Sequence, residues 1–203
     1  MGISTVVFDL GGVVCRYQPE LRLAELAHIY ARTSEDVHRL LYGSGFIGET
    51  EGGLWSAEEI VAEVGARLGH SVGRDELESA WLASFPVDEA VVGLAGRIAV
   101  RHRTAILTNN DLLLREALLR AHPELGEHFG DIVFSADIHA VKPTAEAFSR
   151  ALSILAVEPS DVLFVDDSQA NVAGALKAGL SAVQFQDAAQ LAAELDRHGL
   201  LNV

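Results

Sequence analysis

The sequence predicts an α/β fold: a doubly wound, Rossmann-like parallel sheet with a helical segment inserted after its first strand. From about residue 87 onward, short apolar runs alternate with helical patterns, which indicates βαβ units. A further apolar run lies near the start of the chain, and only helical patterns lie between it and residue 87. We therefore expect a core domain formed by residues 1–15 and 87–203, and a helical cap domain formed by residues 16–86.

The first strand is predicted from Ile3 to Phe8, because an unbroken run rich in Val and Ile indicates a fully buried strand. Apolar residues at helical spacing predict four helices in the inserted segment, at 19–31, 34–42, 56–68 and 75–84. Ser56 and Glu59 have the spacing of a capping box at the start of the third helix. Glycines cluster between residues 43 and 53, and they predict a loop there.

The remaining strands are predicted at 104–107, 131–134, 161–165 and 181–185. Helical patterns precede and separate them, at about 87–100, 111–120, 145–155 and 170–178, and a last helix follows. Strands that are joined in this way run parallel, and the connecting helices cover both faces of the sheet. The carboxyl ends of the strands then lie along one edge, where ligands bind in folds of this kind.

The composition limits the possible partners. The chain has 203 residues, of which 49% are hydrophobic and 22% are charged, so a sizeable core is available. The formal net charge of −14 argues against a nucleic-acid or anionic-membrane partner, since both need a basic surface. The single cysteine, Cys15, excludes an intrachain disulfide and is expected to be buried. No stretch reaches the ~18 apolar residues of a membrane span, so we expect a cytoplasmic protein, either a monomer or a homodimer.

Polar residues recur where the predicted strands end or shortly afterwards. They are Asp9, Thr108, Asn109, Lys142, Asp166 and Asp167. Converging carboxylates repel one another unless a cation lies among them, and Mg²⁺ commonly takes one or two carboxylates together with phosphate oxygens. Phosphoryl transfer depends mainly on positioning and charge neutralisation, and Asp is a known covalent nucleophile for phosphoryl groups. The set therefore indicates a site for a phosphorylated small molecule with Mg²⁺ as cofactor.

Each of these residues also has a simple structural interpretation. Asp166 and Asp167 precede Ser168 in a position suited to a helix cap, Lys142 taken alone is typical of a surface lysine, and residues 108–110 are typical of a turn. Chemistry-bearing residues nevertheless follow four separate predicted strands, and this joint pattern favours a functional site.

The chain resembles the haloacid dehalogenase-like (HAD) hydrolase superfamily over nearly its whole length. The matching motifs are Phe8–Val13, Ile106–Asn109, Val141–Pro143 and Phe164–Ser168, the last continued by Asn171, Gly174–Ala175 and Ala178–Gly179. Each motif alone is weak, but four of them in this order form a specific signal. The helical insert resembles the cap of the first cap subclass, in a branch similar to sugar-phosphate phosphatases and the N-terminal domain of epoxide hydrolases.

The resemblance implies a role for each matching residue. Asp9 would be the nucleophile that becomes an aspartyl phosphate, and Lys142 would bridge it to the transferring group. Thr108, Asn109 and the backbone N–H of Gly12 would hold the phosphoryl oxygens. The metal would be bound by Asp9, by the main-chain carbonyl of Gly11 and by Asp167, with Asp166 beside it.

One position departs from the pattern of the family. Family phosphatases usually carry a second Asp two residues after the nucleophile, which protonates the leaving group and later activates water, and this chain has Gly11 there. Losing such a group typically costs ~10²–10⁴-fold in rate. We expect that the enzyme acts on esters with good leaving groups, such as anomeric sugar phosphates or acyl phosphates, or that the cap supplies the acid. Glu49 and Glu51, in the glycine-rich loop of the insert, are further candidates for contact with the substrate.

Two other functions fit the same fold. A 2-haloacid dehalogenase would be metal-independent and also lacks the second Asp, but its relatives replace the carboxylate pair that Asp166 and Asp167 form here. A catalytically inactive binding protein is the other alternative, which the presence of Asp9 and Lys142 makes less favourable. Trp55 and Trp81 are expected to pack within the cap.

Overall fold

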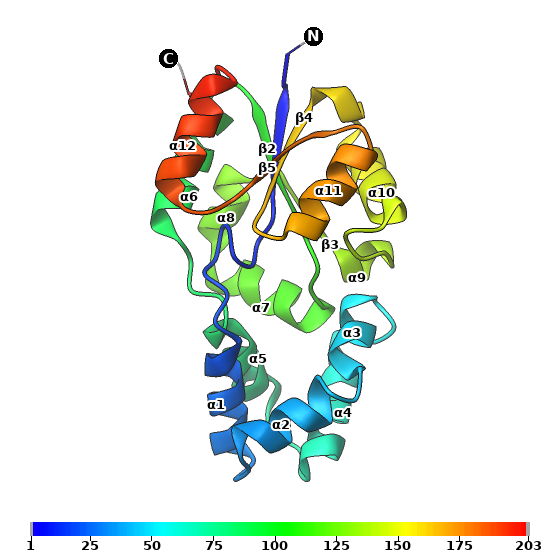
Figure 1. Ribbon diagram of the computed structural model, residues 1–203. Coiled ribbons are helices and arrows are strands. Elements are labelled where there is room, and N and C mark those ends of the chain that lie inside the picture. The colour runs from blue at the N-terminus through cyan, green and yellow to red at the C-terminus, as the bar shows by residue number, and fades with distance from the viewer. Residues whose placement is uncertain (1, 202–203) are drawn as a thin grey trace.

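A computed structural model describes residues 2–201 and contains a five-stranded, fully parallel sheet in the order β3-β2-β1-β4-β5 (Figure 1). The strands are β1 (Thr5–Phe8), β2 (Arg103–Thr108), β3 (Asp131–Phe134), β4 (Val162–Asp166) and β5 (Ser181–Gln184). The first strand lies at the centre, between β2 and β4. All strands point the same way, so residues that follow them in sequence meet at one edge of the sheet.

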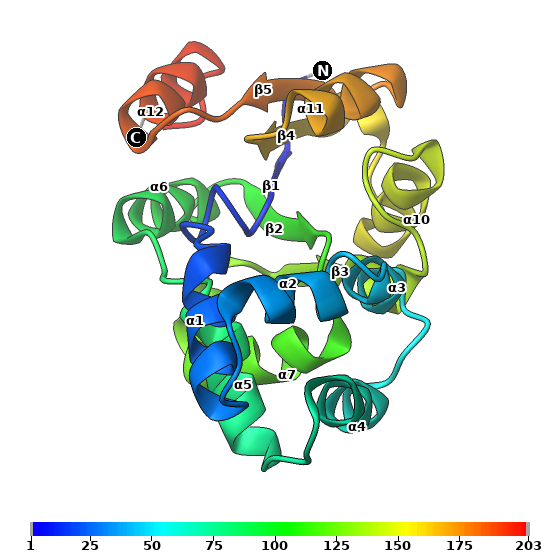
Figure 2. The same ribbon diagram turned by 60° about the horizontal axis from the view of Figure 1, so that its bottom comes forward.

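Helices cover both faces of the sheet, as predicted (Figure 2). Val6 and Phe8 of β1 pack toward α6 (Glu89–Ala99), α7 (Leu112–Ala121), α8 (Pro123–His128) and α12 (Ala188–Arg197). Val7 points to the other face, where it belongs to a second apolar cluster with α9 (Ser135–Ile138), α10 (Ala145–Leu155) and α11 (Gln169–Lys177). The unbroken apolar run of β1 follows from this double burial, since alternating residues serve opposite faces. A short 3₁₀ helix, Pro159–Asp161, precedes β4.

Five helices lie between β1 and α6, and we call this segment, residues 19–83, the helical insert. Its members are α1 (Pro19–Ile29), α2 (Ser34–Leu41), α3 (Phe46–Glu51), α4 (Ala57–Leu68) and α5 (Arg74–Ala83). The insert gathers beyond one end of the sheet, and the described part of the chain begins and ends at the opposite end (Figure 1). It is held against α7 by ion pairs of Arg74 with Glu116 and of Arg120 with Glu78, and by the Trp81 indole, which donates a 2.8 Å hydrogen bond to Asp111.

The prediction of four helices in the insert was wrong, because the insert contains five. Residues 43–53 were expected to form a loop, but α3 begins after Gly45, which adopts a left-handed conformation (φ 84°) as its N-cap, and ends at Glu51. The glycines that suggested a loop lie at the two ends of this short helix, except for Gly48, which lies inside it. The capping box of Ser56 and Glu59 is present at the start of α4 as predicted. The two short helices α8 and α9 were also missed. The boundaries proposed for the two domains stay a prediction.

Cys15 is fully buried and unpaired, as expected, and burial raises the pKa of its thiol to about 12. Trp81 is buried and Trp55 packs on Phe46, so both belong to the core of the insert. Among the described residues, no helix has the length and apolar character needed to cross a membrane.

Candidate active site

The carboxyl edge of the sheet collects the residues predicted from the strand ends. Asp9 directly follows β1, Thr108 is the last residue of β2, and Asp166 is the last residue of β4. Lys142 reaches the same place from the loop between α9 and α10. The parallel sheet thus brings together four segments that are far apart in sequence.

Lys142 is the centre of this group. Its ammonium lies 2.8 Å from Oδ1 of Asp9 and 2.7 Å from Oδ2 of Asp166, and it donates a 2.9 Å hydrogen bond to the carbonyl of Leu107. The residue is only 4% exposed. A buried ammonium needs charged partners and hydrogen-bond acceptors, and Lys142 has both. It therefore cannot be the solvated surface lysine of the simple interpretation.

The backbone of Lys142 is held in place by Asn109. The side-chain amide of Asn109 donates to the carbonyl of Lys142 and accepts from its N–H, both at 2.9 Å. This pairing gives Asn109 a positioning role in addition to its expected contact with phosphoryl oxygens. The hydroxyl of Thr108 accepts a 2.7 Å hydrogen bond from the side chain of Asn110, which also lines the site.

Asp166 and Asp167 differ in their surroundings. Asp166 is fully buried and accepts hydrogen bonds from Lys142, from the backbone N–H of Ser168 and from the Asn171 amide. Asp167 is exposed. Carboxylate oxygens of Asp9, Asp166 and Asp167 nevertheless lie within 4.8 Å of one another, which is a spacing suited to a shared cation. These hard oxygen donors fit Mg²⁺. Because Asp166 is already fully engaged, Asp9 and Asp167 are the more available ligands.

The simple interpretations of these polar residues as helix caps do not hold. The N-cap of α11 is Ser168, whose side chain accepts from Asn171, and the N-cap of α7 is Asp111. Asp166, Asp167, Thr108 and Asn109 are therefore not the residues that satisfy the free N–H groups of these helices.

Negative charge is the main electrostatic feature of the site. The pKa of Asp9 is raised from 3.8 to about 6, because burial and the nearby Asp166 carboxylate outweigh the opposing effect of Lys142. Burial and the Asp166 charge also raise the pKa of Asp167. One lysine thus balances three carboxylates, and a bound cation would relieve the excess charge.

This excess charge predicts a pH-dependent stability difference. A carboxyl group whose pKa is higher in the folded than in the unfolded state stabilises the protein below its unfolded pKa, and that contribution is lost as pH rises through its folded pKa. In EDTA, we expect the melting temperature of the wild type to fall relative to Asp9→Asn between about pH 4 and 6, and Mg²⁺ to reduce the gap at pH 7. Thermal scans across this range check it. A constant difference between the two proteins would contradict the cost assigned to ionised Asp9.

Gly12 allows Asp167 to approach the site. Gly12 has φ +89°, and a Cβ added there would lie 2.4 Å from Oδ2 of Asp167. We expect Gly12→Ala to weaken Mg²⁺ binding, because the methyl group displaces this carboxylate. Gly45→Ala is the matched control: Gly45 has a similar φ of +84° and open space around it. Both variants should lose about 1 kcal/mol of stability from the left-handed conformation, and titration calorimetry should show weaker binding only in Gly12→Ala. Equal affinities would contradict the role of Gly12.

A cavity of about 130 Å³ lies at this edge of the sheet. The core contributes Asp9, Gly11, Thr108, Asn109, Asn110, Lys142 and Asn171, and the insert and its connections contribute Tyr17, Glu51 and Phe85. Glu51 therefore reaches the site, as considered from the sequence. Glu49 does not line this cavity; it is exposed and accepts a hydrogen bond from the Trp55 indole. Tyr17 and Phe85 were missed, because no local pattern marks residues at the two connections of the insert.

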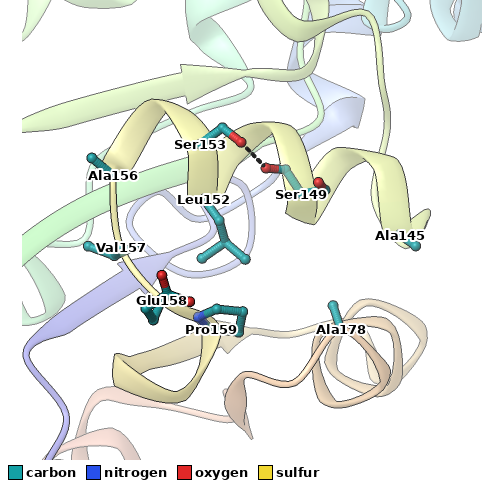
Figure 3. Close-up of a pocket in the computed structure, with 9 residues that line it drawn as sticks. All are labelled: Ala145, Ser149, Leu152, Ser153, Ala156, Val157, Glu158, Pro159 and Ala178. Atoms are coloured by element: carbon teal, nitrogen blue, oxygen red, sulfur yellow. Dashed lines mark hydrogen bonds between the residues drawn. The ribbon is translucent and has the colours of Figure 1, made fainter.

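A larger hollow, of about 540 Å³, lies elsewhere, beside α10 (Figure 3). Leu152 points into it, and Ala145, Ala156, Pro159 and Ala178 complete much of its wall. Glu158 is its one ionisable lining residue among those described. It lacks the grouped charges and polar side chains of the smaller cavity, so the smaller cavity is the candidate active site.

The fold is a doubly wound α/β fold, and the site places the Asp9 carboxylate beside Lys142 at the carboxyl edge of its parallel sheet. The model of one family, the haloacid dehalogenase-like hydrolases, matches residues 3–179, and the chain belongs to that family. This match confirms the family and the hydrolase class that the motifs predicted.

The individual relatives with curated names have low sequence identity to this chain. The chain is 24% identical over 199 residues to D-ribitol-5-phosphate phosphatase of Bacteroides thetaiotaomicron, an alignment that covers 95% of this chain and 97% of the relative. It is 27% identical over 189 residues to validoxylamine A 7'-phosphate phosphatase of Streptomyces hygroscopicus subsp. limoneus, covering 89% and 84%. Bifunctional epoxide hydrolase 2 of Rattus norvegicus is 26% identical over 137 residues, 66% of this chain, and the match spans only 25% of that enzyme.

Solved structures agree with the fold. A predicted HAD-like family hydrolase from Porphyromonas gingivalis superposes with a TM-score of 0.83 at 22% identity, covering 97% of this chain and 99% of the other. A HAD family enzyme from Bacteroides thetaiotaomicron, in complex with magnesium and inorganic phosphate, gives a TM-score of 0.80 at 20% identity, covering 94% and 99%. At these identities the similarity shows the fold.

Proposed function

We propose that this chain is a Mg²⁺-dependent phosphatase that hydrolyses a small phosphorylated metabolite, such as a sugar phosphate, through an aspartyl phosphate on Asp9. The observation that carries the proposal is the arrangement around Lys142, which lies between Asp9 and Asp166 at the floor of the cavity. Relatives named as phosphatases of D-ribitol 5-phosphate and validoxylamine A 7'-phosphate support this substrate class.

The residues of the site divide the chemistry among them. Oδ1 of Asp9 forms a 2.8 Å ion pair with Lys142 and accepts a hydrogen bond from the N–H of Leu10, and these contacts would orient the carboxylate for attack on phosphorus. The attack forms an Asp9–phosphorus bond and breaks the bond between phosphorus and the ester oxygen; water then hydrolyses the aspartyl phosphate. Thr108 and Asn109 line the cavity and would bind phosphoryl oxygens. The N–H of Gly12, which was expected to do the same, instead donates a 2.7 Å hydrogen bond to the carbonyl of Cys15.

A metal at this site would be held by Asp9, Asp167 and the carbonyl of Gly11, with Asp166 behind them. When bound, Mg²⁺ would neutralise charge that develops on the phosphoryl oxygens. Lys142 supplies a fixed positive charge 2.8 Å from Oδ1 of Asp9. The volume of the cavity, about 130 Å³, is below the ~300–1,000 Å³ of typical small-molecule pockets, so it favours a compact substrate.

A panel of phosphorylated metabolites tests the proposal. We expect phosphate release from at least one sugar or polyol phosphate in Mg²⁺ and a return to background in excess EDTA, because the carboxylates would then lack their counter-cation. Activity that persists in EDTA would contradict the metal requirement. If no compound is hydrolysed, chloride release from 2-chloropropionate distinguishes a dehalogenase from an inactive protein of the same fold.

A further inference from the structure

Hydrolysis of an alkyl phosphate needs a proton donor for the leaving group, and the residues at the strand ends have not been given that role. When Asp9 attacks phosphorus, the ester oxygen departs in line, from the side of phosphorus that faces away from Asp9. An alkoxide is a poor leaving group at neutral pH, so a positioned acid that protonates this oxygen accelerates the step. The acid must therefore lie across the cavity from Asp9.

The helical insert lies beyond the carboxyl edge of the sheet (Figure 1), and it contributes Glu51 to the lining of the cavity. Among the described residues that line the cavity, Glu51 is the one carboxyl group other than Asp9. The ammonium of Lys142 is engaged by two carboxylates and a carbonyl, so none of its three N–H groups is free to reach the ester oxygen. Burial raises the pKa of Tyr17 to about 12, which makes its phenol a weaker acid than usual.

Gly11 cannot supply the acid, and its surroundings are already filled. A Cβ added at Gly11 would lie 3.1 Å from the ring of Phe85 and 3.7 Å from Tyr17. These two aromatic side chains pack on each other, with ring centroids 5.3 Å apart. The side chains next to Gly11, which are Tyr17 and Phe85, therefore cannot donate a proton efficiently. Among the lining residues, Glu51 remains as the candidate acid.

Glu51 is held against the core by its backbone. It is the last residue of α3, and its carbonyl accepts a 2.6 Å hydrogen bond from the hydroxyl of Ser135. The same hydroxyl accepts from the N–H of Asn110, so one side chain fixes both Glu51 and a lining residue of the cavity. Two residues later, Gly53 passes so close to the core that an added Cβ would lie 2.2 Å from the carbonyl of Ala136. The contacts of Glu51 with Ser135 and of Gly53 with Ala136 therefore hold the end of α3 close to the site.

The electrostatic surroundings keep Glu51 suited to proton transfer. Burial, together with the carboxylates of Asp111 and Asp9, raises the pKa of Glu51 from 4.5 to about 7. Arg22 opposes them. The Arg22 guanidinium stacks over the ring of Trp81, 4.6 Å from its centroid, so an aromatic ring occupies one of its faces. An acid with a pKa near the working pH is both protonated often enough to donate and basic enough to accept.

We propose that Glu51 is the general acid and base of this phosphatase, which rests on the function proposed above. In the first step, its carboxyl proton moves to the ester oxygen while the Asp9–phosphorus bond forms and the phosphorus–oxygen bond breaks, releasing the alcohol. In the second step, water attacks the phosphorus of the aspartyl phosphate from the same side, the bond between phosphorus and the Asp9 oxygen breaks, and the Glu51 carboxylate takes the proton of the water. Inorganic phosphate leaves, and both carboxyl groups return to their starting state.

Glu51→Gln is the direct test, with Glu49→Gln as the matched control on the same helix. Each protein is assayed in Mg²⁺ with ribitol 5-phosphate, whose alkoxide leaving group needs a proton, and with p-nitrophenyl phosphate, whose leaving group does not. We expect Glu51→Gln to lose ~10²–10⁴-fold in kcat/KM with the alkyl ester. With the aryl ester, rapid mixing should show a stoichiometric burst of nitrophenolate followed by slow turnover, because the second step lacks its base. Glu49→Gln should match the wild type in both assays.

A pH profile of the wild type gives a second readout that needs no variant to fold. With the alkyl ester, kcat/KM should fall as the pH rises above the pKa of Glu51, and with the aryl ester this limb should be absent. Wild-type rates in Glu51→Gln, a loss of the same size in Tyr17→Phe only, or identical limbs for both esters would overturn the role of Glu51 while leaving the phosphatase proposal intact. A wild type that releases phosphate from neither these esters nor the wider panel would overturn both.

Discussion

Asp9→Asn is expected to abolish phosphate release, with a loss of roughly 10⁴-fold or more, as is typical for removal of a nucleophile. The amide keeps the size of the side chain but cannot form the aspartyl phosphate. The variant should fold at least as well as the wild type in the absence of metal, because burial raises the pKa of Asp9 and its ionised form is costly. Steady-state phosphate release and thermal unfolding, measured on the same preparation, check both statements.

Asp196→Asn is the control for this change, since it makes the same substitution at an exposed position of α12. It should leave both activity and stability as they are in the wild type. An Asp9→Asn protein that still releases phosphate at a substantial fraction of the wild-type rate would contradict the role of Asp9 as the nucleophile. A variant that is inactive because it is unfolded would contradict the electrostatic description of the site.

Lys142→Met is expected to cause the largest loss of stability among single changes at the site. The substitution leaves the Asp9 and Asp166 carboxylates together without the ammonium that lies 2.8 and 2.7 Å from them. Breaking a buried ion pair by removal of one partner typically costs about 3–5 kcal/mol. The deficit should shrink as the pH is lowered, because protonation of the carboxyl groups removes their repulsion. Denaturant unfolding at neutral and acidic pH measures this dependence.

The chain contains one other lysine, which provides a matched control. Lys177 is exposed at the end of α11, and Lys177→Met should change the free energy of unfolding by less than about 0.5 kcal/mol, as is usual for surface substitutions. If Lys142→Met unfolds at the same denaturant concentration as Lys177→Met, the buried ion pairs of Lys142 do not stabilise the protein. Phosphatase activity should be lost in Lys142→Met alone.

The sheet and the catalytic candidates were predictable because they depend on local signals. A strand buried on both faces has an unbroken apolar run, and the residue after such a strand lies at the ligand-binding edge whatever the connecting segments do. Asp9, Thr108 and Asp166 could therefore be placed together from sequence. The family model confirms the class of protein that these residues suggested.

The contribution of the insert was harder to predict, because it depends on how two parts of the chain dock. The glycines around α3 predicted a loop, although a helix of six residues forms there. The position of Glu51 depends on Ser135, which is 84 residues away in sequence, and no periodic pattern records that contact. Tyr17 and Phe85 line the cavity only because both connections of the insert pass beside Gly11. Likewise, the positioning of Lys142 by Asn109 joins two loops 33 residues apart.

The central claim is that the reaction passes through a covalent phosphate on Asp9, and acid quenching of the enzyme during turnover tests it most directly. The protein is mixed with a radiolabelled phosphate ester and Mg²⁺, quenched in acid within the first turnover, and digested for peptide mapping. We expect label on the peptide that contains Asp9, loss of the label on treatment with hydroxylamine, and no label in Asp9→Asn or in excess EDTA. Phosphate release without any labelled protein, or label on a different residue, would contradict the account.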